Sequence, residues 1–395
     1  SARHSSEFGI NATFNGVDMT GVNCYKDGVI SRLYKGLSGL IKSRNVTYVE
    51  GFGKLVSPNT VEVNGTQYTG KNVVLATGSY AKTLPGLDVD GKRVITSDHA
   101  LNMDYVPKSA IVLGGGVIGC EFASVWKSFG SEVTIIEALP RLVALEDETS
   151  SKQLERAFRK RKIEFEVGSR FKSHTVNADS VTVTLENDKS FTAEVLLVAV
   201  GRGPVSAGIG YEEQGIKMDR GYVLVDDKCR TNVPGVWAVG DLIPTLQLAH
   251  VGFQEGILVA EEIADLNPRP INYDGVPRVT YSEPEVASVG LSTAVAKERG
   301  YDVVEISYDL AGNGKSQILK TAGSVKLVAE KNGPVLGVHM VGDRVGELLA
   351  EAQLIFNWEA SADDVAPLIH AHPTMSEAMG EAFLALAGKP LHAHG

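Results

Sequence analysis

The stretch from Ser109 to Glu137 constrains the fold more than any other part of the sequence. A short apolar run predicts a buried strand, which leads into Gly114, Gly116 and Gly119 with the spacing G-x-G-x-x-G. A stretch compatible with a helix follows, and then a second apolar strand that ends at Glu137. A strand, a glycine turn, a helix and a second strand closed by an acid make a βαβ unit, so we predict an α/β fold with a parallel sheet.

The glycines and the acid of this unit predict a dinucleotide site. The first glycine makes the tight turn, the second lets the backbone approach a pyrophosphate, and the third lets helix and strand pack closely. The helix N-terminus offers free N–H groups to phosphate. A carboxylate at Glu137 accepts hydrogen bonds from a ribose diol and repels a 2′-phosphate, which favours NAD over NADP. The predicted NAD-binding residues here are Gly114, Gly115, Gly116, Val117, Ile118, Gly119 and Glu137.

The composition excludes several classes of protein. A chain of 395 residues is long enough for two or three domains. Its net charge of −10, without a basic run, argues against nucleic acid and anionic membranes as partners. No apolar stretch approaches the roughly 20 residues that span a bilayer. The cysteines Cys24, Cys120 and Cys229 are too far apart for a disulfide framework or a metal site, so we expect no metal and a cytoplasmic location.

The segments on either side of the βαβ unit predict further domains. Upstream, helical spacing covers 25–44, and a buried strand at 72–79 runs into a glycine. Downstream, a strand at 236–239 ends in Gly240-Asp241, which is the end of a strand where open α/β sheets bind ligands. Strands followed by helices after 272 predict a separate α+β domain. Short strands are predicted at 46–51, 54–56, 60–63 and 67–69, with Asn64-Gly65 as a hairpin turn.

A histidine and a glutamate near the C-terminus suggest acid–base chemistry. His372 precedes a predicted helix over 375–385, in which Thr374 is a candidate N-cap and Glu377 takes the third position. A carboxylate placed there can reach back to the imidazole, fix its tautomer and stabilise its protonated form. From the spacing alone, a purely structural cap is an equally good interpretation.

Five short segments together resemble a known family. They are ATGS at 76–79, GGGVIG at 114–119, AVGR at 199–202, AVGD at 238–241 and HAHPTMSE at 370–377. In this order they resemble the pyridine nucleotide–disulfide oxidoreductases, over essentially the whole chain. Within that family the sequence looks most like the branch that oxidises dihydrolipoamide. The resemblance implies two Rossmann-like nucleotide-binding domains, of which the FAD domain is incomplete, and a C-terminal α+β dimerisation domain.

The resemblance also implies where these domains lie. A partial FAD-binding domain would cover 1–107 and continue over 231–271. The NAD-binding domain would cover 108–230, and the C-terminal dimerisation domain 272–395.

Roles for particular residues follow from the same resemblance. In such enzymes the carboxylate corresponding to Asp241 accepts a hydrogen bond from the flavin ribityl chain. Glu121 would pair with a lysine beside the flavin, and Gly201 would join the NAD site. His372 and Glu377 would be catalytic, taking a proton from a dithiol and returning it, on the flavin of the partner in a homodimer. The implied FAD-binding residues are Gly53, Thr77, Gly78, Gly240, Asp241 and Ala249.

The implied reaction oxidises protein-bound dihydrolipoamide to lipoamide and passes the electrons through a disulfide and FAD to NAD⁺. The implied partner is the lipoyl domain of the E2 component of a 2-oxoacid dehydrogenase complex. Two family motifs, a second G-x-G-x-x-G for FAD and a C-x-x-x-x-C disulfide, are absent from residues 1–395. We therefore expect a fragment that keeps the NAD unit, binds FAD weakly or not at all, and has lost catalysis.

Other interpretations stay open on the sequence alone. The chain is compatible with a related flavoprotein such as glutathione reductase, mercuric reductase or a soluble pyridine nucleotide transhydrogenase. It is also compatible with a non-catalytic fragment that binds NAD and dimerises.

Overall fold

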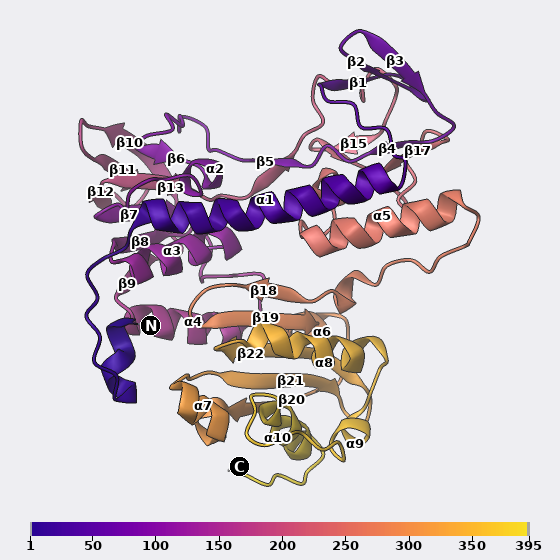
Figure 1. Cartoon of the computed structure of the whole chain (residues 1–395). Helices are drawn as coiled ribbons and strands as arrows, with labels where there is room; N and C mark the ends of the chain where they lie inside the picture. The colour runs from indigo at the N-terminus through magenta and orange to yellow at the C-terminus, as the bar shows by residue number, and fades with distance from the viewer. Residues whose placement is uncertain (1, 393–395) are drawn as a thin grey trace. The chain divides into compact units, whose positions relative to one another are not determined.

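The computed structural model describes residues 2–392, so residue 1 and residues 393–395 of the predicted terminal domains lie outside the described part. The chain divides into two compact units. The first comprises residues 1–48, 83–142 and 158–199, and the second comprises 49–82, 143–157 and 200–395. Figure 1 shows the elements of both units by their labels.

A parallel sheet of five strands, in the order β6-β13-β7-β8-β9, is the centre of the first unit. The helix α3 (Val117–Phe129) packs against β7 and β8, and Gly130 ends it with φ 118°. The predicted βαβ unit is therefore present. The central strands are continuous buried apolar runs, 110–113 in β7 and 195–198 in β13, as expected for parallel strands covered on both faces. The strands are β6 (Val94–Ile95), β7 (Ser109–Leu113), β8 (Glu132–Ile136), β9 (Ile163–Glu166) and β13 (Val195–Val198).

A long helix and a small antiparallel sheet complete the first unit. The helix α1 (Met19–Ser43) begins before the predicted start at 25, because the Asp18 side chain caps it by accepting from the Thr20 amide at 3.0 Å. Short helices are η1 (Ala2–Phe8) and α2 (Ser97–Ala100). The antiparallel sheet contains β10 (Phe171–Val176), β11 (Val181–Leu185) and β12 (Ser190–Ala193). The helix α4 (Glu148–Lys160) spans the division between the units.

The second unit contains several short strands, and some of them adjoin the segments 76–79 and 238–241 that were predicted to bind FAD. The parallel pair is β4 (Val73–Leu75) with β17 (Val236–Ala238), and the helix α5 (Ala249–Ile263) follows β17. A hairpin turns at Asn64-Gly65 as predicted. The antiparallel strands are β1 (Gly53–Ser57) with β2 (Thr60–Val63) and β3 (Thr66–Thr69), β5 (Ser79–Ala81) with β14 (Arg202–Pro204), and β15 (Met218–Asp219) with β16 (Tyr222–Val223).

Two strand predictions differ from the structure. The buried strand predicted at 72–79 is reduced to β4 (Val73–Leu75), in which only Leu75 is buried, and the strand predicted at 46–51 is wrong. Residues 46–51 contain no strand, and the side chains of Val46 and Tyr48 are 58% and 70% exposed. Alternation of apolar and polar residues gives a strand only where a partner strand completes its hydrogen bonds and another layer of the protein covers its apolar face. The structure gives this segment no such partner.

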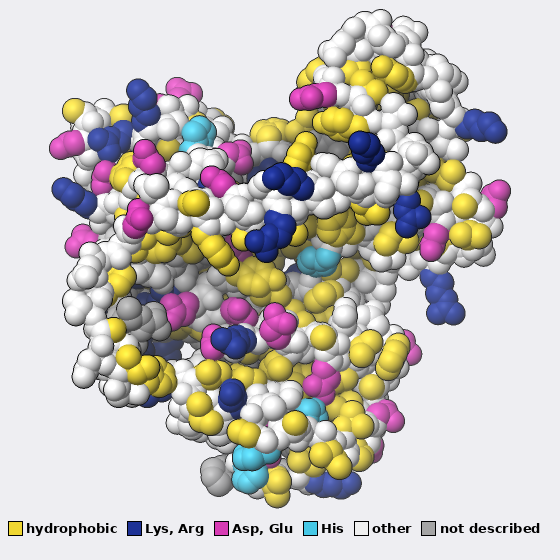
Figure 2. All heavy atoms as spheres, in the orientation of Figure 1, with side chains coloured by type: hydrophobic (Ala, Val, Ile, Leu, Met, Phe, Trp, Pro, Cys, Tyr) yellow, Lys and Arg dark blue, Asp and Glu magenta, His cyan; other side chains and the backbone are white. Residues whose placement is uncertain are grey.

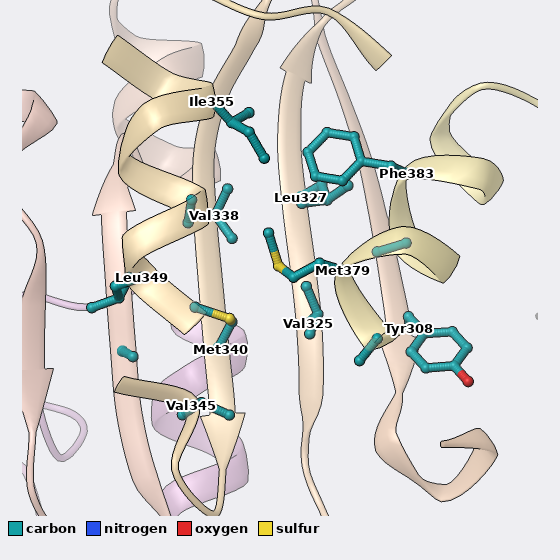
Figure 3. Close-up of a cluster of buried hydrophobic side chains, with 14 of the residues drawn as sticks. Tyr308, Val325, Leu327, Val338, Met340, Val345, Leu349, Ile355, Met379 and Phe383 are labelled. Carbon is teal, nitrogen blue, oxygen red and sulfur yellow. The ribbon is translucent and has the colours of Figure 1, made fainter. Parts of the chain in front are cut away.

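The C-terminal part of the second unit is an antiparallel sheet of five strands covered by helices. The strand order is β18-β19-β22-β21-β20. The helices α8 (Val345–Asn357) and α10 (Glu377–Leu386) pack on the sheet around a core that includes Leu327, Val338 and Phe383 (Figure 3). The strands are β18 (Arg278–Thr280), β19 (Glu285–Gly290), β20 (Val303–Asp309), β21 (Ser324–Glu330) and β22 (Val335–Gly342). The helices are α6 (Thr293–Glu298), α7 (Gly314–Leu319), α8 (Val345–Asn357), α9 (Ala362–Val365) and α10 (Glu377–Leu386), with short turns η2 (Gly240–Leu242), η3 (Tyr273–Gly275) and η4 (Leu310–Gly312) elsewhere in the unit.

Strands followed by helices were expected from residue 272 onward. The helices α8, α9 and α10 do follow the last strand, whereas α6 and α7 lie between strands. The helix predicted over 375–385 begins two residues later, at Glu377, and ends one residue later, at Leu386. Figure 2 shows histidine side chains at the surface of this C-terminal part. No helix within residues 2–392 is long and apolar enough to cross a membrane.

Candidate functional site

The glycine turn between β7 and α3 is tightly closed. Gly114 has φ 114°, a conformation that favours glycine, and its amide donates to the Ile136 carbonyl at 2.8 Å. A Cβ added at Gly119 would lie 1.9 Å from the Gly114 carbonyl oxygen. Only glycine at position 119 therefore lets the first turn of α3 lie on the preceding loop.

Gly116 has a different environment. It is the N-cap of α3, and a Cβ added there would meet nothing within 4 Å. The neighbouring Val117 is 41% exposed. The first amides of α3 have no intrahelical acceptors, as in any helix. The space beside Gly116 is thus open to an anionic group, and the turn fits the pyrophosphate of a dinucleotide.

Glu137 lies at the end of β8 and faces the glycine turn. Its two carboxylate oxygens accept hydrogen bonds from the Gly115 amide at 2.5 Å and from the Leu139 amide at 2.7 Å. Each oxygen has a second lone pair, so the carboxylate can hold the turn and still accept from ribose hydroxyls. The first unit therefore brings together Gly114, Gly115, Gly116, Gly119 and Glu137, with Val117 and Ile118 in the first turn of α3.

The structure locates two further residues of the predicted NAD site without testing their roles. Glu121 is half-buried in α3. Gly201 has φ 110° and belongs to the second unit, directly before β14. Their roles toward a cofactor stay predictions.

Residues 76–79, 200–202 and 238–241 lie in the second unit, and a side chain from each of these segments takes part in one cluster. The Asp241 carboxylate accepts from the Ser79 hydroxyl at 2.5 Å. Arg202 donates from Nε to the same hydroxyl at 2.6 Å, and this Nε lies 3.8 Å from Asp241 Oδ2. Asp241 is half-buried, so its carboxylate is held by the protein while part of it faces solvent. The sequence did not identify Ser79 and Arg202 as partners of Asp241.

The other predicted FAD residues also lie in the second unit. Gly240 and Gly78 have φ 72° and 71°, and a Cβ at either would meet nothing within 4 Å. Thr77 donates from its hydroxyl to the Val205 carbonyl at 2.5 Å. Gly53 begins β1, and Ala249 is the first residue of α5. Glycine turns with open space at the carboxyl ends of β4 and β17 fit a flavin nucleotide.

A buried carboxylate supports the Gly240 turn. Glu255 is fully buried and accepts from the Gly240 amide at 2.6 Å, from the Thr245 hydroxyl at 2.8 Å and from the Tyr273 hydroxyl at 3.0 Å. Burial, together with this carboxylate, raises the pKa of Tyr273 well above its usual value. The sequence did contain a signal for Glu255, because it lies on the face of α5 that also buries Val251 and Leu258.

The C-terminal histidine and glutamate lie together as predicted. His372 Nδ1 lies 2.8 Å from Glu377 Oε1, and the Thr374 amide donates to Glu377 Oε2 at 2.8 Å. The predicted N-cap is wrong, because α10 begins at Glu377 and Ser376 is its N-cap. The hydrogen bond from the Thr374 amide is the largest cause that lowers the pKa of Glu377. Burial opposes it, and the nearby His372 and His370 rings lower the pKa further.

This geometry leaves one nitrogen of His372 available. Because a carboxylate can only accept, Nδ1 carries the proton of the bond to Glu377. The Nε2 atom then has a lone pair, and the His372 side chain is 77% exposed. The pair can take up a proton at Nε2 while Glu377 stabilises the resulting imidazolium, which is the chemistry of a general base.

The cysteines do not form a redox pair in this structure. Cys24 is exposed, Cys120 and Cys229 are buried, and none is in a disulfide. Burial, with a contribution from Glu255, raises the pKa of Cys229 to about 12. Within residues 2–392 no cluster of three or more histidine, cysteine or acidic side chains could hold a metal ion.

Comparisons with known proteins give one family. Residues 3–256 match the family model described as pyridine nucleotide-disulphide oxidoreductase, and residues 276–383 match that of its dimerisation domain. Dihydrolipoyl dehydrogenase 1 of Arabidopsis thaliana mitochondria is 39% identical over 99% of this chain and 80% of its own length. A dihydrolipoyl dehydrogenase of Bacillus subtilis is 38% identical over 99% of this chain and 87% of its own length. A leghemoglobin reductase of Vigna unguiculata is 38% identical over 100% of this chain and 77% of its own length.

Solved structures of other proteins have the same fold as this chain. LpdA of Mycobacterium tuberculosis has a TM-score of 0.89 at 24% identity, covering 97% of this chain and 86% of that chain. The flavoprotein disulfide reductase RclA of Escherichia coli has a TM-score of 0.85, covering 93% of this chain and 86% of that chain. The α/β fold class with a C-terminal dimerisation domain is confirmed. Together, the family models and the relatives of 38–39% identity show that the chain belongs to the pyridine nucleotide–disulphide oxidoreductase family.

Proposed function

We propose that this chain serves an oxidoreductase that oxidises protein-bound dihydrolipoamide with NAD⁺. In the overall reaction the dithiol loses two electrons and two protons, NAD⁺ gains a hydride, and one proton is released. The observation that carries the proposal is the hydrogen bond between His372 and Glu377, which leaves a lone pair on an exposed imidazole nitrogen. Dihydrolipoyl dehydrogenase is also the name of relatives that are 38–39% identical over 99% of this chain.

The His372–Glu377 pair would move the proton. The Nε2 atom takes the proton of a substrate thiol, so that the sulfur can act as a thiolate. Glu377 holds the Nδ1–H bond and balances the charge of the imidazolium. When the sulfur is released as part of the product disulfide, the proton leaves through the same exposed nitrogen.

The cofactor sites are part of this proposal. Bound FAD would supply the step in which two electrons pass from sulfur to nicotinamide. The residues that would hold FAD are Gly53, Thr77, Gly78, Gly240, Asp241 and Ala249, and those for NAD are Gly114, Gly115, Gly116, Val117, Ile118, Gly119, Glu121, Glu137 and Gly201. The chain's part is to bind phosphate at open glycine turns and ribose hydroxyls at carboxylates, with NAD preferred through Glu137.

The partners are proposed from the family. The match to a dimerisation domain supports a homodimer, in which His372 of one copy would act at the flavin site of the other. The names of the relatives support the lipoyl domain of a 2-oxoacid dehydrogenase complex as substrate. The cytoplasmic location predicted from cysteine usage belongs to the same proposal.

Residues 1–395 by themselves contain no C-x-x-x-x-C to form the redox disulfide. We therefore expect them to show no dihydrolipoamide oxidation alone. The test is a chimera that carries the N-terminal segment of the Bacillus subtilis relative in front of this chain. NADH formation from dihydrolipoamide and NAD⁺, at least tenfold faster than NADPH formation from NADP⁺, is the expected result. Turnover of glutathione disulfide with NADPH, and none of dihydrolipoamide, would sink the proposal.

A non-catalytic role for residues 1–395 is the second candidate. It is favoured by the continuous βαβ unit, because Gly114 to Glu137 need no other segment for the turn to close. NAD binding by a dimer without flavin absorbance, combined with an inactive chimera, would support this candidate over the first.

A further inference from the structure

A second carboxylate–imidazole pair lies close to the first. His370 Nε2 is 2.8 Å from Glu351 Oε1, and the His370 side chain is only 12% exposed. Glu351 belongs to α8, whereas His370 lies in the segment that joins α9 to α10. Neither residue was assigned a role from the sequence.

The ring of His370 is confined from the side of α10 as well. A Cβ added at Gly380 would lie 2.6 Å from His370 Nδ1, so the ring fills the space that the missing side chain leaves. The ring is therefore held between a hydrogen bond to α8 and the backbone of α10. An imidazole held on both sides fixes the main chain that carries it.

The residues on either side of His370 are exposed. Ile369, directly before it, is 98% exposed, and His372, two residues after it, is 77% exposed. Downstream, the Thr374 hydroxyl donates to the Ala371 carbonyl at 2.6 Å, and Asn313 donates from Nδ2 to the Thr374 carbonyl at 3.0 Å. His372 thus lies between an anchor at His370 and a second anchor at Thr374.

We propose that Glu351 and His370 are a positioning pair that holds His372 against Glu377. Their bond fixes the backbone two residues before His372, and so keeps His372 Nδ1 within hydrogen-bond distance of the Glu377 carboxylate. The neutral His372 ring then carries its proton on Nδ1 and leaves Nε2 bare. The importance of a bare Nε2 rests on the proposed function, but the positioning itself is a property of this chain.

Four substitutions distinguish an effect of the position of the His370 ring from an effect of the Glu351 charge. Glu351→Ala removes the acceptor, and alanine suits the middle of a helix. Glu351→Gln keeps an acceptor oxygen and so should rescue the pair. Gly380→Ala displaces the His370 ring without changing any charge. Glu381→Ala is the matched control, because it breaks another pair of the same kind, between Glu381 and His392 at 2.8 Å.

The readout is the tautomer of the His372 ring. Ring nitrogen chemical shifts in protein labelled with ¹⁵N-histidine distinguish a protonated from a bare nitrogen, and His372→Gln assigns the signal. At alkaline pH, where imidazoles are neutral, the unchanged protein should show His372 mainly as the Nδ1–H form. Glu351→Ala and Gly380→Ala should each make Nε2–H the major form. Glu351→Gln and Glu381→Ala should leave the Nδ1–H form dominant.

Unchanged His372 shifts in Glu351→Ala and in Gly380→Ala would overturn the proposal. A change in Glu351→Ala without one in Gly380→Ala would assign the effect to charge, and would overturn positioning as its cause. Equal changes in Glu381→Ala would show a general loosening of α10, which would overturn it as well. The tautomer measurement needs neither substrate nor cofactor, so its result does not depend on whether the proposed reaction is correct. In the same way, the result of the chimera assay does not depend on whether Glu351 and His370 position His372.

Discussion

Two glycines of the β7–α3 turn should respond in opposite ways to the addition of one methyl group. A Cβ at Gly119 would lie 1.9 Å from the Gly114 carbonyl oxygen, whereas a Cβ at Gly116 would meet nothing within 4 Å. Contacts of a Cβ closer than 3.0 Å essentially do not occur, so Gly119→Ala must move α3 by about 1 Å from the turn. The obstructing atom is backbone and cannot rotate away.

The expected energies follow from these distances. Overpacking of this kind costs about 3 kcal/mol, and the loss should be local to β7 and α3. Alanine at the N-cap position of Gly116 costs only about 0.5 kcal/mol relative to glycine. Its methyl group would instead occupy the space proposed for the pyrophosphate. We expect Gly116→Ala to weaken NADH binding at least about tenfold, which corresponds to about 1.4 kcal/mol.

Two assays distinguish these effects. Hydrogen exchange of the amides in 109–129 reports the local free energy of opening, and NADH fluorescence titration reports affinity. Gly119→Ala should accelerate exchange in α3 by about two orders of magnitude, whereas Gly116→Ala should leave it within a few-fold. If Gly119→Ala exchanges like the unchanged protein, the close approach of α3 is wrong. If Gly116→Ala binds NADH normally, the pyrophosphate does not lie at this turn.

Three further predictions test other parts of the site. Glu137→Ala should weaken NADH binding about tenfold while changing NADPH affinity little, as the ratio of the two dissociation constants will show. Burial opposes ionisation of Asp147, but the nearby His339 ring and the Lys326 ammonium outweigh it and lower the pKa to about 2. Because this folded-state pKa is depressed, the stabilisation is present above pH 4 and is lost as the pH falls from about 4 to about 2. Urea unfolding at several pH values should show this loss, and Asp147→Asn should reduce it. In the native protein iodoacetamide should label the exposed Cys24. It should label Cys229 only after unfolding, because Cys229 is buried and burial raises the pKa of its thiol to about 12. Mass spectrometry of the labelled peptides will show whether Cys229 is already modified in the native state.

The elements that the sequence predicted well are those with local causes. The βαβ unit from Gly114 to Glu137 has its strand, turn, helix and acid within one continuous stretch, so spacing alone was sufficient. The His372–Glu377 contact was predicted for the same reason, since it joins residues five positions apart. The N-cap of α10 was nevertheless misplaced by two residues, because Thr374 uses its hydroxyl on the Ala371 carbonyl. Helix ends depend on such competing hydrogen bonds.

The contacts that were missed join distant parts of the chain. Ser79 reaches Asp241 across 162 residues and Arg202 across 123, and no local pattern contains that information. Glu351 and His370 are closer in sequence, but their bond depends on how α8 and α10 pack on the C-terminal sheet. The strand wrongly predicted at 46–51 has the same cause. Its local pattern of residues suits a strand, but the structure gives it no partner strand, and the local sequence does not reveal this.

The central claim is that His372 exchanges protons with a dithiol. The most direct test compares the chimera that carries the Bacillus subtilis N-terminal segment with its His372→Gln form, measuring NADH formation from dihydrolipoamide and NADH binding in parallel. The account predicts that His372→Gln lowers kcat at least about 100-fold, within the range for loss of a general base, and leaves NADH affinity within about twofold. Equal turnover by the two forms, with equal NADH affinity, would contradict it.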